Sequence, residues 1–155
     1  MTIIGDSAFY NCSSLTSITI PDGVTSIGYE AFYNCSSLTS IIIPDSVTSI
    51  GGYAFEDCSS LTEIKFKDMA SYCQIDGLRN VDKSKVYIGG QKLTEMTSIV
   101  IPDGVTYIGS SAFHSCSSLT SITIPDGVTS IGEYAFEYCS SLTEIKFKDM
   151  ASYCQ

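Results

Sequence analysis

Basic residues, and charges of any kind, are scarce in this chain. Lys and Arg together number 8 against 17 Asp and Glu, and charged residues make up 16% of the 155 residues. The resulting formal charge of −9 argues against binding to nucleic acid or to anionic lipid, because an acidic surface repels phosphate. No apolar run approaches the ~18 residues that a membrane-spanning helix needs. Hydrophobic residues reach 44%, which excludes a disordered chain.

Residues that carry chemistry are also few. His114 is the one histidine, and other copies of its repeat hold Tyr or Glu in the same slot, which indicates a solvent-facing position. The seven cysteines include no C-x-x-C pair, so no zinc site is expected. With no second histidine and no Lys–Ser pairing at a useful spacing, nucleophilic catalysis has no support, and Gly89-Gly90 is typical of a hairpin turn rather than a phosphate-binding loop. The sequence therefore predicts no enzyme activity and no catalytic, cofactor-binding or metal-binding residues.

A repeat of 23 residues dominates the chain. Its consensus is I-G-x-x-A-F-x-x-C-S-S-L-T-x-I-x-I-P-D-x-V-T-x, and copies begin at Ile4, Ile27, Ile50, Ile108 and Ile131. A longer period is also present, because residues 61–74 return identically at 142–155, an offset of 81. One unit cannot bury its own apolar face, whereas stacked copies can, so the repeat predicts a solenoid.

Each unit predicts the same local structure. The I-x-I alternation predicts a strand with one inward face, ended by proline, and the A-F-x-x-C spacing, as in residues 29–35, suits one helical turn. We therefore expect an α/β fold, a right-handed leucine-rich repeat solenoid with a parallel sheet of one strand per repeat and short helical turns on the other side. The expected strands are residues 17–20, 40–43, 63–66, 98–101, 121–124 and 144–147. A continuous aromatic stack is expected from Phe9, Phe32, Phe55, Phe113 and Phe136.

The middle of the chain differs from the repeats. Six of the eight basic residues lie between Lys65 and Lys92. Within this part, residues 68–73 are compatible with a helix, and residues 86–93 resemble a hairpin with a Gly-Gly turn. We expect a single solenoid domain over 1–155, with regular repeats at 3–67 and 97–148 and an irregular basic insertion at about 68–96.

The ends of the chain predict a fragment of a longer array. Met1 starts inside a repeat, with no basic segment and apolar run of a signal peptide, and the C-terminal residues begin a second copy of the insertion. Cut repeats expose apolar faces and strand edges, so end-to-end self-association is expected.

The unit I-G-x-x-A-F-x-x-C-x-x-L-x-x-I-x-I-P-x-x-V resembles the BspA-like (Treponema pallidum-type) leucine-rich repeat family, over residues 3–67 and 97–148. One departure from the ordinary leucine-rich pattern is clear, because the slot of its asparagine ladder holds Gly23, Ser46, Gly104 or Gly127. The resemblance implies a large secreted or cell-surface adhesion protein. It implies as partners extracellular-matrix proteins or other microbial cells, with a glycan as a further candidate. The acidic charge and the short apolar runs predict no nucleic-acid partner and no membrane insertion.

Two surfaces are candidates for binding. The first comprises the small, mostly uncharged outward positions of the strands: Ser17, Thr19, Ser40, Ile42, Glu63, Lys65, Ser98, Val100, Ser121, Thr123, Glu144 and Lys146. The second is a set of tyrosines on the turn side: Tyr10, Tyr29, Tyr33, Tyr53, Tyr134 and Tyr138. A protein-interaction module is the favoured interpretation. A carbohydrate-binding module and a structural spacer that displays other domains stay as alternatives.

Two residue ladders have structural interpretations. Five cysteines share one repeat slot, and we expect them to be buried free thiols, with Cys73 and Cys154 in a second slot. Their stacked side chains would be too far apart and wrongly aimed for relaxed disulfides. Four aspartates, Asp22, Asp45, Asp103 and Asp126, recur in P-D turns. Stacked carboxylates invite Ca²⁺, but local backbone bonding is the favoured interpretation.

Overall fold

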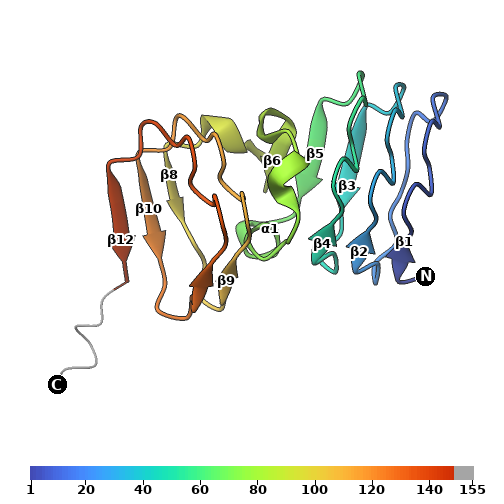
Figure 1. Cartoon of the computed structure of the whole chain (residues 1–155). Helices are drawn as coiled ribbons and strands as arrows, with labels where there is room; N and C mark the ends of the chain where they lie inside the picture. The colour runs from blue at the N-terminus through green and yellow to red at the C-terminus, as the bar shows by residue number, and fades with distance from the viewer. Residues whose placement is uncertain (149–155) are drawn as a thin grey trace.

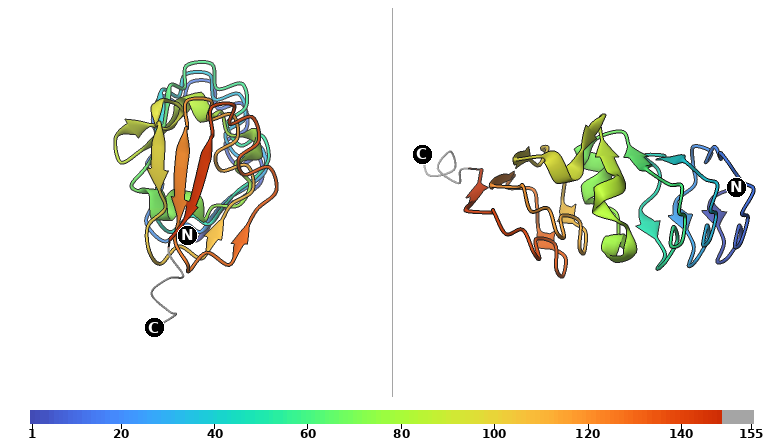
Figure 2. Two further views of the ribbon diagram at one scale, coloured as in Figure 1. Left: turned by 90° about the vertical axis from the view of Figure 1, so that its left-hand side faces the viewer. Right: turned by 90° about the horizontal axis from the view of Figure 1, so that it is seen from above.

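The computed structural model describes residues 1–148 as a stack of coils that advances along one axis (Figure 1). The first coil lies at one end of the stack and β12 at the other, and the coils superimpose on a common closed outline when seen along the axis (Figure 2). Neighbouring coils are joined by parallel pairing of equivalent short strands. The solenoid expected from the repeat is therefore confirmed.

Short strands and very few helical turns make up the coils. The strands are β1 (Ile3–Ile4), β2 (Ser26–Ile27), β3 (Ser40–Ile43), β4 (Ser49–Ile50), β5 (Glu63–Phe66), β6 (Val86–Ile88), β7 (Gln91–Lys92), β8 (Ser98–Val100), β9 (Tyr107–Ile108), β10 (Ser121–Ile124), β11 (Ser130–Ile131) and β12 (Glu144–Phe147). The helix α1 spans Met69–Cys73, and the 3-10 turns are η1 (Leu78–Asn80), η2 (Lys83–Lys85) and η3 (Leu93–Glu95).

Two ladders of strands run along the stack, and each is divided near its middle. The first ladder joins β1, β2 and β4, and continues after the insertion as β9 and β11. The second joins β3, β5, β6 and β7, and continues as β8, β10 and β12. The β6–β7 pair is antiparallel and turns at Gly89-Gly90, as the sequence predicts.

The strand expected at residues 17–20 is absent, although the other five form. Ile18 and Ile20 still point toward the core, and Ile20 is 6% exposed. Within residues 1–148, no main-chain hydrogen bonds of a sheet join this segment to β3. Its side chains still alternate between core and solvent, because the two isoleucines pack into the core. The expected strand at 98–101 ends one residue early, at Val100.

The prediction of a helical turn at residues 29–35 is also wrong. Glu30 and Asn34 have left-handed φ values of 51° and 54°, and the same two slots are left-handed in every regular repeat. Phe32 donates its N–H across to the Ala54 carbonyl of the next coil at 2.9 Å, whereas Tyr33 donates back to the Glu30 carbonyl at 3.1 Å. In a helix each N–H beyond the first turn donates to a carbonyl of the same segment four residues earlier. Here the next coil accepts alternate bonds, so the segment forms linked turns instead.

Glycine after the strand lets two coils touch backbone to backbone. The Gly51 N–H donates to the Ile27 carbonyl of the preceding coil at 2.7 Å. A Cβ at Gly51 would lie 2.4 Å from the Tyr29 backbone nitrogen, closer than real Cβ atoms approach. Gly28 and Gly132 meet the preceding coil in the same way. The repeated glycine is therefore required by the spacing of the coils.

The aromatic core consists of two stacks, which corrects the expectation of one. Phe9, Phe32 and Phe55 stack with centroid distances of 5.2 and 5.7 Å, and Phe113 stacks on Phe136 at 5.5 Å. Phe32 and Phe113 are fully buried, as expected. The stacks are separate because the insertion places α1 between the third and fourth regular coils (Figure 1).

Tyr72 of α1 connects the two halves of the core. Its ring makes edge contacts with Phe66 at 4.9 Å and with Phe113 at 6.1 Å, and its buried hydroxyl donates to the Ala112 carbonyl. Asp68 begins the helix, because its side chain accepts the Ser71 N–H at 2.9 Å. The helix expected at 68–73 thus forms and supplies the residue that joins the coils on either side.

We expect Gly51→Ala to lower the free energy of unfolding by about 2 kcal/mol or more, because the added methyl must push two backbones apart. Gly5→Ala is the matched control. It changes the same slot in the first coil, where an added Cβ meets nothing within 4 Å. Urea unfolding of both variants tests this, and equal losses would contradict the spacing argument.

We expect Tyr72→Phe to cost about 1–3 kcal/mol, because it leaves the buried Ala112 carbonyl without its donor while keeping the ring. The control is Tyr87→Phe, on a half-exposed outward ring, where a change within about 0.5 kcal/mol is expected. Thermal and urea unfolding measure both. A Tyr72→Phe variant as stable as the parent would show that the hydroxyl bond contributes nothing.

Candidate interaction surface

The outward residues of the second ladder form what we call the strand face. Its first part lies on β3, β5 and β6, where Ser40 stands beside Glu63, and Ile42 stands beside Lys65. Lys65 is in turn beside Tyr87 of β6. Four of the predicted surface residues are thus brought together in two rows.

The second part of the strand face lies on β8, β10 and β12. One row comprises Ser98, Ser121 and Glu144, and the other comprises Val100, Thr123 and Lys146. The β6–β7 hairpin stands between the two parts, so the predicted residues do not form one continuous sheet. Ser17 and Thr19 lie outside any strand.

Two branched apolar side chains stand out on this face. Ile42 is 65% exposed and Val100 is 63% exposed, whereas the other isoleucines of β3 are buried. Neither exposed side chain contributes to the core. Contact with a partner would remove their apolar surface from water, which favours binding by the hydrophobic effect.

The charges near the strand face are paired. Lys65 lies 2.8 Å from the Glu63 carboxylate, and Lys146 lies 3.6 Å from the Glu144 carboxylate. The pairs cancel much of the charge along these rows. The surface therefore offers small polar and apolar contacts rather than a strong field.

Two residues of the aspartate ladder have lysine partners. Lys67 lies 3.0 Å from Asp45, and Lys148 lies 2.7 Å from Asp103. The Asp45 carboxylate raises the pKa of Lys67. Within residues 1–148, no group of three or more His, Cys, Asp or Glu side chains converges as it would around a metal ion.

Four of the six turn-side tyrosines contact one another in pairs. Tyr10 and Tyr33 stack with centroids 5.0 Å apart, and Tyr29 meets Tyr53 edge to face at 5.9 Å. The neighbouring Asp57 raises the pKa of Tyr33 to about 12 by hydrogen bonding and by its charge. Tyr134 and Tyr138 are the most exposed of the set, and the Arg79 guanidinium lies over the Tyr134 ring at 5.8 Å from its centroid.

His114 makes surface contacts on the same side. Its Nδ1 lies 2.9 Å from the Ser115 hydroxyl, and its Nε2 lies 3.4 Å from the Glu137 carboxylate. The ring also meets Tyr138 edge to face at 5.3 Å. The imidazole thus lies between a serine hydroxyl and a glutamate carboxylate on the molecular surface, an arrangement that the repeat pattern does not predict.

The repeated cysteines form a thiol ladder. Cys35 donates its S–H to the Phe9 carbonyl of the preceding coil at 3.2 Å, and Cys58 donates to the Phe32 carbonyl at 3.1 Å. Burial raises the pKa of Cys35 to about 11 and that of Cys116 to about 12. Cys35 and Cys116 are therefore poor nucleophiles in the folded state. The expectation of five buried thiols is wrong for Cys12 and Cys139, which lie in the end coils and are only partly buried.

Cys73 is buried in α1, and burial raises its pKa to about 12. Cys12, Cys35, Cys58, Cys73, Cys116 and Cys139 are free thiols in the structure. Cys154 lies outside the described residues. Cys73 therefore resembles the ladder cysteines in environment, although it comes from the irregular insertion.

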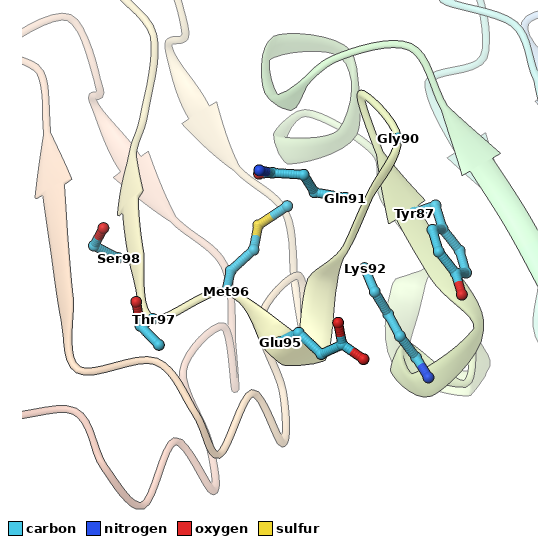
Figure 3. A pocket seen from close by; sticks show the side chains of 8 residues that line it. All are labelled: Tyr87, Gly90, Gln91, Lys92, Glu95, Met96, Thr97 and Ser98. Atoms are coloured by element: carbon cyan, nitrogen blue, oxygen red, sulfur yellow. The ribbon is translucent and has the colours of Figure 1, made fainter.

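Sequence reasoning missed three residues beside the strand face. Tyr87 lies in the row of Lys65, and Gln91 and Met96 line a cavity of about 550 Å³ next to β8 (Figure 3). The V-Y-I alternation at 86–88 could have placed Tyr87 outward. The position of Met96 depends on the path from the hairpin to β8, for which the sequence carries no repeat signal.

Comparison with known proteins gives a family match over the whole chain. A model of the BspA type leucine rich repeat region matches residues 1–94 and 90–155, in 6 copies. Among curated proteins no similar sequence was found. No helix of the described residues is long and apolar enough to cross a membrane.

Several solved bacterial proteins are similar in structure. A leucine-rich repeat protein of T. pallidum is 30% identical, with 94% of this chain and 62% of that chain covered and a TM-score of 0.49. A leucine-rich cell surface protein of Faecalibacterium prausnitzii is 25% identical, with 97% and 58% covered and a TM-score of 0.46. The pneumococcal vaccine antigen PcpA is 26% identical, with 94% and 37% covered and a TM-score of 0.49. The chain thus spans less than two thirds of the length of each of these proteins.

We expect the folded protein to lose stability as the pH rises from about 9 to about 12. The thiols have folded-state pKa values above their ordinary value of 9.0, so over this range they keep protons that the unfolded chain releases. Urea unfolding at stepped pH under reducing conditions measures the effect. Cys35→Ala should flatten the profile, whereas the exposed-site change Ser13→Ala should leave its slope unchanged. Buried Lys83, whose pKa burial lowers to about 8, acts in the opposite direction up to its ordinary value of 10.5. A parent profile that is flat or rising above that pH would contradict the thiol pKa directions.

Proposed function

Because the chain belongs to the BspA-type leucine-rich repeat family, we propose that it is a non-catalytic protein-interaction and adhesion module of a secreted or cell-surface protein. The observation that carries this proposal is the exposure of Ile42 and Val100 on the strand face, where polar and charged side chains make up most of the outward rows. The description of the F. prausnitzii relative as a cell surface protein supports the location. An extracellular-matrix protein or a protein on another cell is the proposed partner.

The tyrosine geometry favours a protein partner over a glycan. A sugar packs its C–H groups against the open face of an aromatic ring. Tyr10 and Tyr33 each cover one ring face of the other, and Tyr29 and Tyr53 meet edge to face, so fewer open faces are left in these four rings. Ring edges and hydroxyl groups suit protein contacts, in which tyrosine is enriched. The carbohydrate-binding module and the structural spacer are the alternatives that the test must separate.

The test measures binding of the chain to purified extracellular-matrix proteins, to intact microbial cells and to polysaccharides. We expect protein or cell binding, and we expect Ile42→Asp to weaken it about tenfold or more, because a charge replaces an apolar contact. Ile42→Thr is the control, since threonine fills this slot in neighbouring repeats, and it should retain binding. Both changes are outward, so unfolding curves should match the parent.

Other outcomes would decide against the proposal. Binding to polysaccharide alone would favour the carbohydrate module. No binding to any of the three classes would favour a spacer. If the chain binds a protein and Ile42→Asp does not weaken that binding, the strand face is not the binding surface.

A further inference from the structure

The two halves of the second ladder are separated by a notch. On one side stands β7, which pairs with β6, and on the other stands β8, which pairs with β10. Within residues 1–148 no pairing joins β7 to β8. Figure 3 shows the side chains of Gln91 and Met96 reaching into the space between the hairpin and β8. The notch therefore lies between two strand edges that have no partner strand.

The backbone of β8 identifies the groups that face the notch. The Ile101 N–H donates to the Thr123 carbonyl at 2.9 Å, and the Thr97 carbonyl accepts the Thr120 N–H at 2.7 Å. Alternate residues of a strand bond to opposite sides, so residues 97, 99 and 101 bond to β10. Ser98 and Val100 therefore direct their N–H and C=O groups toward the notch, and both residues are exposed.

The notch has the size of a short strand. A strand residue within a sheet takes up roughly 160 Å³, given about 4.8 Å between strands, a rise of about 3.3 Å and about 10 Å between layers. The cavity beside Gln91 and Met96 measures about 550 Å³, which corresponds to roughly three residues. An adjoining cavity of about 340 Å³ continues it along Ile99 and Val100. The strand β8 itself is three residues long.

The floor of the notch suits an apolar side chain. Met69 and Met96 line the adjoining cavity and pack partly buried against the core, while Lys67 and Asp68 also line this cavity. Methionine is flexible and adapts to different apolar neighbours. A strand in the notch would point alternate side chains at this floor and the others to solvent.

We propose that the notch between β7 and β8 binds an extended segment of a partner protein as an added strand. Main-chain bonds to Ser98 and Val100 supply the affinity, and an apolar side chain over Met69 and Met96 supplies the selectivity. The free N–H and C=O groups of this edge are spaced to pair with an extended backbone, so the proposed occupant is a strand. The proposal rests on the proposed interaction function and gives the form of the partner.

The probe is a synthetic peptide with the sequence of residues 120–125, Thr-Ser-Ile-Thr-Ile-Pro, acetylated and amidated at its ends. This sequence already pairs with the other edge of β8 as β10. We expect it to shift the NMR amide signals of Ser98 and Val100 and to slow their hydrogen exchange. The same peptide with N-methyl groups on both isoleucines should bind at least about tenfold more weakly, because it lacks the donors.

The matched protein variants are Val100→Pro and Val100→Thr. Proline removes the N–H that faces the notch, leaves the bonds of Ile99 and Ile101 to β10, and is tolerated at a strand edge. We expect Val100→Pro to weaken peptide binding at least about tenfold and Val100→Thr to leave it within about threefold. Unfolding curves check that both variants fold. Met96→Lys, which changes no backbone group, tests the floor independently and should also weaken binding.

The outcomes are distinct. No shift at millimolar peptide, or binding that neither Val100→Pro nor N-methylation weakens, would overturn the proposal. Notch signals that shift with protein concentration alone would assign the site to a second copy of the chain and also overturn it. The probe is independent of the natural partner, so these failures leave the strand-face proposal, tested through Ile42, intact.

Discussion

The backbone contact between successive coils is the constraint on which this structure depends. The glycine after each first-ladder strand has no side chain, so Gly51 can donate to Ile27 while the Tyr29 backbone passes where a Cβ would stand. That spacing places each phenylalanine over its equivalent and brings each cysteine thiol to a carbonyl of the preceding coil. Threonine hydroxyls add further bonds between coils, as from Thr48 to the Thr25 carbonyl at 3.3 Å. Main-chain hydrogen bonds thus determine which residue of one coil lies over which residue of the next. The stacking of the side chains results from this alignment.

The same constraint explains which parts of the fold the sequence could predict. Periodicity gives the stacking and five of the six strands, because inward isoleucines recur at the strand period. It fails for residues 29–35, where the A-F-x-x-C spacing looks helical within one unit. Asn34 and Glu30 instead take left-handed conformations that cost a non-glycine residue energy. Bonds from alternate N–H groups to the next coil offset that cost. These acceptors come from a neighbouring coil, so local spacing within one unit gives no sign of them.

The candidate surface was predictable to the same extent. Alternation along the strands correctly placed Ile42 and Val100 outward, because side chains of a strand point to opposite faces in turn. Alternation gave no warning that the surface is divided. The sequence predicts a hairpin at 86–93, but whether its second strand pairs with β8 depends on the path through η3 and Met96. That path is not repeated anywhere in the chain, so no period could reveal it.

The insertion continues the first ladder but interrupts the second, and this difference determines the form of the surface. In the first ladder it supplies a substitute rung, since Asp76 pairs with Ser49 and the Gly109 N–H donates to the Cys73 carbonyl at 2.6 Å. The coils on both sides therefore stay connected, and Tyr72 fills the core between them. In the second ladder the insertion ends in a hairpin and leaves an open edge at β8. The nearby Lys65 and Lys67 have acidic partners, whereas Lys92 and Glu95 line the cavity beside this edge. Apolar contact and main-chain hydrogen bonds act only at short range, so recognition through them favours a partner that matches the edge in shape.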